Sequence, residues 1–180
     1  GFSPTEKIFL FSGRPSRMKG IEYLLEAAKK QRGPFRLVLM LAHQPYDEYA
    51  RVIKFIGDNK LSELVVVIEP VSHQEMPEYL AIADVVVIPS LTEEFCFLAA
   101  ETAAMKIPMI VSDVGALPEV VSGHVLFAAP ADVDQLHKAI ELALEERFDS
   151  LPTKTFSWDS TLQKYEELYT KSVIDLPQSS

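Results

Sequence analysis

The sequence predicts an α/β protein with a doubly wound, Rossmann-like parallel sheet of about six strands flanked by helices on both faces. Short runs of Val, Ile and Leu alternate along the chain with amphipathic stretches of helical period. Because these apolar runs are nearly continuous, they are typical of parallel strands that are buried on both faces. With 180 residues and 48% hydrophobic content, the chain can bury a substantial core.

Each apolar run is followed by a helical stretch, and this alternation sets the expected elements in order. The expected strands are 7–12, 35–41, 64–68, 84–88, 108–112 and 125–128. The expected helices are 21–31, 46–56, 74–81, 97–105, a short turn from Leu117, 132–145 with Asp132 as N-cap, and a last helix near 158–171. The polar stretch 147–154, which contains Pro152, indicates a domain boundary before that last helix.

Composition excludes several classes of function. A formal net charge of −9 argues against a nucleic-acid-binding face. The single cysteine excludes an internal disulfide and the four histidines lack metal-ligand spacing, so we expect no metal site. No apolar run is long enough to span a bilayer and no signal peptide is evident, so a cytoplasmic location is expected. Since the chain does not begin with Met, we expect it to be part of a longer protein.

A basic loop follows the first expected strand. Gly13 opens it, and Arg14, Arg17 and Lys19 lie in a stretch that has no acidic residue. A guanidinium can bind two phosphate oxygens at once, an ammonium adds a mobile charge, and the helix beginning after Gly20 adds backbone dipoles of the same sign. A dinucleotide fingerprint fits poorly, because proline occupies the position of its second glycine. The loop therefore suggests a diphosphate site, with a solvated basic loop as the alternative.

A pair of carboxylates spans the expected loop and helix start after the fourth strand. Glu101 lies among alanines, which allow close helix packing, and can accept both hydrogen bonds from a ribose diol. Glu93 could do the same for a sugar ring, while the amides of 95–98 would face a phosphate. The alternative is a surface glutamate on an ordinary helix. Strand order 3-2-1-4-5-6 would place the first and fourth strands side by side, so we expect both carboxylates and the cations Arg14 and Lys19 around one crevice.

A third motif lies between the fifth strand and the helical turn that follows. Gly115 provides the backbone freedom for a tight turn, and Pro118 suits a helix start. The backbone amides of Ala116 and Leu117 are expected to be free to contact an anion or a sugar. A plain connection between strand and helix explains the motif equally well.

Taken together, these motifs resemble the C-terminal, nucleotide-sugar-binding half of retaining GT-B glycosyltransferases of family 4 (glycosyl transferases group 1). The resemblance runs from Ile8 to about Tyr169. It is carried by Gly13-Arg14…Lys19-Gly20, residues 83–90, Glu93-x7-Glu101, residues 108–112 and 115–121, and Phe156-Ser157-Trp158-Asp159…Tyr165…Leu168-Tyr169.

The resemblance implies a nucleotide-sugar-binding Rossmann-like domain over 1–155, a C-terminal crossover helix over 156–172 and a tail over 173–180. It implies a hexosyltransferase-like enzyme that moves a sugar from a nucleoside-diphosphate sugar to an acceptor with retention, without metal or cofactor, and that is inactive as this isolated half. The implied catalytic residues are Glu93, Arg14 and Lys19. The implied substrate-binding residues are Gly13, Arg14, Lys19, Val71, Glu93, Phe95, Cys96, Phe97, Glu101, Ala116 and Leu117.

The resemblance also implies a partner, the N-terminal GT-B half, present in cis or as a separate chain. It leaves the base, sugar and acceptor open, including a membrane-associated acceptor that the full-length enzyme reaches as a peripheral protein. The chain departs from the family pattern where glycine is favoured and it has Glu69, Glu94, Cys96 and Lys106. These departures favour an alternative, a non-catalytic module that kept the fold and lost donor binding. A sugar-nucleotide epimerase of the same architecture is a third reading.

Overall fold

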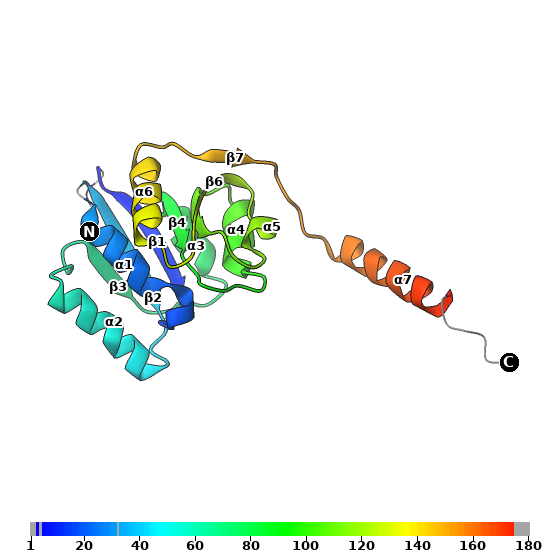
Figure 1. The fold of residues 1–180 in the computed structure, drawn as a ribbon, viewed down its shortest axis with the longest axis horizontal. Coiled ribbons are helices and arrows are strands. Elements are labelled where there is room, and N and C mark those ends of the chain that lie inside the picture. Colours follow the sequence, from blue (N-terminus) through cyan, green and yellow to red (C-terminus); the bar gives the residue numbers. More distant parts are fainter. Residues whose placement is uncertain (1–2, 4, 32, 175–180) are drawn as a thin grey trace.

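The computed structural model describes residues 3, 5–31 and 33–174, and a single seven-stranded sheet organises them (Figure 1). The strand order β3-β2-β1-β4-β5-β6-β7 confirms the expected doubly wound arrangement. Strands β1 to β6 run parallel, and β7 pairs antiparallel with β6. The strands are β1 (Lys7–Gly13), β2 (Phe35–Leu41), β3 (Val65–Ile68), β4 (Val85–Ile88), β5 (Met109–Ser112), β6 (Gly123–Ala128) and β7 (Asp149–Leu151).

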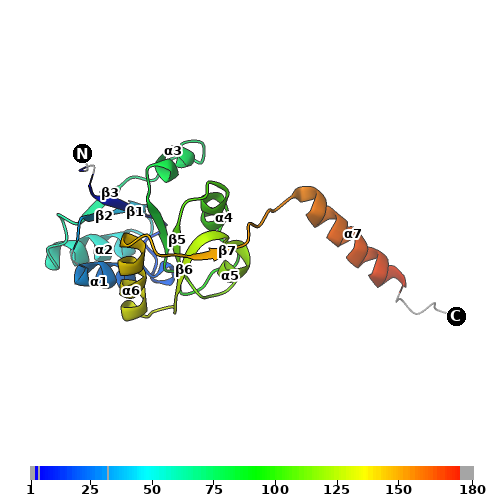
Figure 2. The same ribbon diagram turned by 90° about the horizontal axis from the view of Figure 1, so that it is seen from above.

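Helices cover both faces of the sheet and create two hydrophobic cores. One core joins the sheet to α1, α2 and α6, and the other joins it to α3, α4 and α5 (Figures 1 and 2). Strand β1 shows why: Phe9 and Phe11 face the first core and Leu10 the second, as a side-chain period of two requires. The helices are η1 (Arg17–Lys19, one 3₁₀ turn), α1 (Ile21–Lys30), α2 (Tyr46–Asp58), α3 (Met76–Ala81), α4 (Phe97–Ala104), α5 (Leu117–Val120), α6 (Val133–Leu144) and α7 (Trp158–Ile174).

The expected N-cap of α6 is confirmed, because the Asp132 carboxylate accepts hydrogen bonds from the amides of Asp134 and Gln135 at 3.0 and 2.9 Å. Strand β7 was not expected, and it lies within the stretch 147–154 that reads as a boundary. Its three residues carry no apolar alternation, so only their pairing with β6 reveals them as an edge strand.

The last helix, α7, stands apart from the sheet at the end of an extended linker (Figures 1 and 2). Its aromatic residues Trp158, Tyr165 and Tyr169 are exposed. Of the tail expected over 173–180, residues 173 and 174 belong to α7 and 175–180 lie outside the described residues. No helix in the described part of the chain is long and apolar enough to cross a membrane.

Two glycines allow three loops to meet at the carboxyl edge of the sheet. A Cβ atom on Gly20, where φ is +67°, would lie 1.8 Å from the Pro89 carbonyl oxygen. On Gly115, where φ is +56°, it would lie 2.0 Å from the Glu93 carbonyl oxygen. Both positions combine a left-handed backbone with a close backbone approach, and only glycine accommodates both. The β4–α4 loop is therefore held between the β1–α1 loop and the β5–α5 loop.

Replacing Gly115 by alanine should lower the free energy of unfolding by about 1–3 kcal/mol, because the new methyl group forces the Glu93 backbone to move. Gly57→Ala is the matched control, since a Cβ there meets nothing within 4 Å and the residue lies inside α2. That control should raise stability by about 0.5–1 kcal/mol. Urea unfolding followed by circular dichroism measures both, and equal effects of the two substitutions would contradict the packing described above.

Candidate functional site

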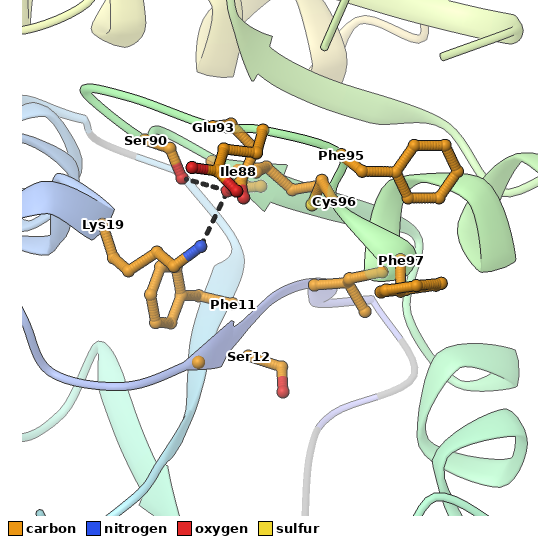
Figure 3. Close-up of a pocket in the computed structure, with 13 residues that line it drawn as sticks. Phe11, Ser12, Lys19, Ile88, Ser90, Glu93, Phe95, Cys96 and Phe97 are labelled. Atoms are coloured by element: carbon orange, nitrogen blue, oxygen red, sulfur yellow. Dashed lines mark hydrogen bonds and ion pairs between the residues drawn. The ribbon is translucent and has the colours of Figure 1, made fainter. Parts of the chain in front are cut away.

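A cavity of about 400 Å³ opens at the carboxyl ends of β1 and β4, where the strand order reverses (Figure 3). Ligands of doubly wound sheets bind at this type of position. The cavity combines an apolar floor from the two strands with polar groups from the loops that follow them. Its lining consists of Phe11, Ser12, Gly13, Lys19, Val87, Ile88, Ser90, Glu93, Glu94, Phe95, Cys96, Phe97 and Leu98.

A cation, a carboxylate and a hydroxyl meet in this cavity. Lys19 Nζ lies 2.7 Å from Glu93 Oε2, and Ser90 Oγ donates to the same oxygen at 3.1 Å (Figure 3). The pair is partly buried, with side-chain exposures of 29% for Lys19 and 13% for Glu93. Lys19 and Ser90 both bind Oε2 of the Glu93 carboxylate, and no hydrogen bond to Oε1 is seen among the described residues. Three side chains that can exchange hydrogen bonds with a polar ligand are thus held together.

Backbone contacts hold these three side chains in place. Lys19 is the last residue of the 3₁₀ turn η1. Its N–H donates to the Ser16 carbonyl at 3.0 Å, which stabilises the turn. The β4–α4 loop is joined to this turn through the Leu91 N–H, which donates to the Met18 carbonyl at 2.7 Å. On its other side, the Ala116 N–H donates to the Glu93 carbonyl at 3.2 Å. The loop that carries Glu93 is therefore fixed from both flanks.

The cavity also includes the start of helix α4. Cys96 is its N-cap, with φ +33° and ψ +88°, and Lys106 beyond its end has φ +60°. These left-handed conformations explain in physical terms why glycine would be favoured at both positions. Glu94 is not among the described positive-φ residues. Burial raises the pKa of the Cys96 thiol, because the thiolate would be poorly solvated; the Ala99 N–H opposes this, and the Glu93 carboxylate adds to it.

Glu101 does not line the cavity that contains Lys19 and Glu93. It lies on α4 beside a second cavity of about 360 Å³, with its Oε1 atom 3.6 Å from Nδ1 of His73. It lies four positions beyond Phe97, or about 6 Å along the helix axis at 1.5 Å per residue. Of the four charged side chains expected around a single crevice, this cavity brings together Lys19 and Glu93 alone; Glu101 lies on α4, outside the cavity lining.

Some of the remaining predicted site residues line the cavity with Lys19 and Glu93, and others do not. Gly13, Phe95, Cys96 and Phe97 line the cavity. Arg14 follows Gly13, is exposed and does not line the cavity. Val71 lies in the β3–α3 loop, half-buried against the core on the α4 side of the sheet.

The expectation that the amides of Ala116 and Leu117 are free is wrong. The Ala116 N–H donates to the Glu93 carbonyl and the Leu117 N–H to the Val114 carbonyl, each at 3.2 Å. The close approach at Gly115 brings the Glu93 carbonyl within reach of the first of these amides.

Ser90 is the residue whose role sequence reasoning missed. It is only 1% exposed, yet its hydroxyl faces the cavity and donates to Glu93. The available signal was a small polar residue two positions after a fully apolar strand, at the edge where ligands bind. In the described part of the chain, no cluster of His, Cys, Asp or Glu is suited to a metal ion. The arrangement can bind an anion through Lys19 and hydroxyl groups through Glu93.

Comparison with known proteins finds similar chains that are named as sugar-transferring enzymes. The chain is 28% identical over 191 residues to an MMP alpha-(1->4)-mannosyltransferase of Mycolicibacterium hassiacum, covering 96% of this chain and 46% of that protein. Among solved structures, sucrose-phosphate synthase from Thermosynechococcus elongatus superposes with a TM-score of 0.73 at 25% identity, covering 95% of this chain and 46% of that chain. Anabaena Alr3699/HepE, solved in complex with UDP and glucose, superposes with a TM-score of 0.69 at 15% identity, covering 93% and 49%.

The chain thus spans less than half the length of the mannosyltransferase and of each of these two structures. The two solved structures share the GT-B architecture of glycosyltransferases, which agrees with the sheet described above. The sequence profile of the family described as glycosyl transferases group 1 matches residues 1–155, which is well over half of the chain. The protein accordingly belongs to the glycosyl transferases group 1 family.

Proposed function

We propose that this chain is the donor-binding half of a retaining glycosyltransferase and that it binds a nucleoside-diphosphate sugar at the Lys19–Glu93 cavity. The observation that carries this proposal is the convergence of Lys19, Glu93 and Ser90 at the point where the strand order reverses. The structural relative from Anabaena, whose fold this chain shares, was solved with UDP and glucose, and this supports the same class of ligand here.

In this proposal Lys19 binds the diphosphate without leaving Glu93. An ammonium has three N–H donors, so one can remain on Glu93 Oε2 while the others reach phosphate oxygens. The first turn of α4 adds the backbone N–H groups of Phe97 and Leu98 and the positive end of the helix dipole, whereas the next two N–H groups donate to the Cys96 carbonyl oxygen. Arg14, one residue beyond the cavity-lining Gly13, adds a second cation on a long flexible side chain.

Glu93 and Glu101 divide the hydroxyl groups of the donor between them. Oε1 of Glu93 accepts a hydrogen bond from the transferred sugar, because Oε2 is already engaged by Lys19 and Ser90. Glu101, further along α4, accepts from the ribose next to the second cavity. A nucleoside-diphosphate sugar is an extended ligand, so two sites along one helix suit it better than one crevice.

The chemistry follows from the same charges. The bond between the anomeric carbon and the diphosphate oxygen breaks, and its electron pair stays on the diphosphate, where Lys19 stabilises the growing charge. The acceptor oxygen forms its bond on the same face of the sugar and gives its proton to the departing diphosphate, which retains the anomeric configuration. We infer that the remainder of a longer cytoplasmic enzyme supplies the acceptor site, so this half alone turns over little substrate.

Lys19→Ala should weaken nucleoside-diphosphate binding by about 1.5–3 kcal/mol, because a charge-assisted hydrogen bond is lost. Calorimetric titration with UDP, GDP and ADP measures this, and thermal unfolding shows whether the variant is folded. Arg17→Ala is the matched control, a basic residue of the same loop that does not line the cavity. Arg14→Ala should also weaken nucleoside-diphosphate binding. If the unaltered chain releases no heat with any of the three nucleotides, the proposed function is wrong.

Glu94→Gly tests whether the donor site is intact as it stands. Glu94 lines the cavity and is exposed, so its carboxylate repels a diphosphate weakly through solvent. We therefore expect UDP, GDP or ADP to bind the unaltered chain measurably and to gain less than about 1 kcal/mol in the variant. A gain of several kcal/mol from a chain that otherwise shows no binding would instead indicate a module that has lost its donor.

A further inference from the structure

The linker between β7 and α7 is attached to the domain at two points. Lys154 Nζ donates to the Pro118 carbonyl oxygen at 2.8 Å. The ring of Phe156 packs edge-on against Phe95, with centroids 5.5 Å apart and an interplanar angle of 81°. Phe95 lies two residues beyond Glu93 in the sequence, and Pro118 lies three residues beyond Gly115, which approaches the Glu93 carbonyl.

The loop that receives this contact contains an unfavourable backbone conformation. Cys96 has φ +33° without being glycine. Such a residue persists only where its surroundings hold it. Its two neighbours, Phe95 and Phe97, are in ring contact across it, with centroids 5.1 Å apart and an interplanar angle of 65°. Phe95 is therefore the shared ring of two aromatic pairs, one local and one contributed by the linker.

These three rings differ from hydrophobic residues scattered singly over a surface, which need no explanation. Phe95 contacts each of the other two rings in the edge-to-face geometry that aromatic pairs prefer, and its pair with Phe156 connects two segments distant in the sequence. The Phe95 ring also points away from Lys19 and Glu93 (Figure 3), and Phe156 packs against this ring. Phe156 itself is 57% exposed and lies outside both cores, and its ring pairs with that of Phe95.

We propose that Phe156 is a positioning residue for the candidate site: by packing on Phe95 it stabilises the left-handed conformation at Cys96 and keeps Glu93 facing Lys19. Without its ring, Phe95 keeps only its local partner, and the loop samples conformations in which Cys96 relaxes. The positioning effect is a property of the folded chain alone. Its consequence for ligand binding rests on the proposed function.

Cys96 provides a ligand-free probe, because it is the only cysteine of the chain and lies at the strained position. The rate at which 5,5′-dithiobis(2-nitrobenzoate) modifies it reports how often the loop opens. Phe156→Ala should react about two- to tenfold faster, the range that follows from losing one aromatic pair. Phe156→Tyr keeps the ring and should restore the original rate, which a general loosening of the fold would not explain.

Trp158→Ala is the matched control, because this aromatic residue lies two positions further, is 81% exposed and has no recorded ring contact with another described residue. It should leave the Cys96 rate unchanged. Circular dichroism identifies any variant that does not fold, and Phe156→Leu, which keeps apolar bulk without a ring, then replaces Phe156→Ala. A folded ring-less variant that reacts at the original rate would overturn the proposal.

Calorimetric titration of the same variants with UDP, GDP and ADP separates this proposal from the proposed function. If the unaltered chain binds a nucleotide, Phe156→Ala should weaken that binding several-fold while Trp158→Ala does not. Faster Cys96 modification without weaker binding would overturn the role of Phe156 in ligand binding. If the unaltered chain binds none of the three, the proposed function fails, and the Cys96 rates still decide whether Phe156 positions the loop.

Discussion

The candidate site depends on a steric constraint: two backbone segments approach the β4–α4 loop more closely than any side chain would permit. Gly20 lies against the Pro89 carbonyl and Gly115 against the Glu93 carbonyl, both with left-handed backbones. This approach allows the Leu91 and Ala116 amides to find carbonyl acceptors across the loops, so the polar backbone of a surface loop is satisfied internally. The carboxylate of Glu93 is consequently directed at Lys19 by the backbone, before any ligand is present.

The chain has a net charge of −9, which repels anions. An anion site in it therefore requires that nearby cations and N–H groups outweigh the repulsion from the acidic surface. At physiological ionic strength, exposed charges are screened over about 8 Å, so most of the acidic surface contributes little at the cavity. The partly buried Lys19 is screened less, and the N-terminus of α4 adds its dipole. Glu93 occupies one donor of Lys19 and leaves the others, so it holds the ammonium in position and does not simply neutralise it.

The sequence was sufficient to predict the order of strands β1 to β6 and the meeting of Lys19 with Glu93, because apolar runs and the switch-point rule determine which loops are neighbours. It was not sufficient for features that depend on exact distances. Whether the Ala116 amide is free depends on how closely Gly115 approaches Glu93, and the separation of Glu101 from the cavity depends on the direction of α4. The role of Ser90 and the strand β7 were also not predictable from local sequence. A single hydroxyl or a three-residue edge strand gains its role only from the partner that the fold places beside it.

The same reasoning applies to the boundary of the domain. The family profile ends at residue 155, where the recognisable alternation of strands and helices has already stopped. Yet the next residue, Phe156, packs on the loop that carries Glu93, and Lys154 just before it is bonded to the helix after Gly115. The end of the family profile therefore falls between two segments that pack together. If the linker stabilises a strained residue in the β4–α4 loop, then the smallest unit with a properly formed site must extend past the family match to include Phe156.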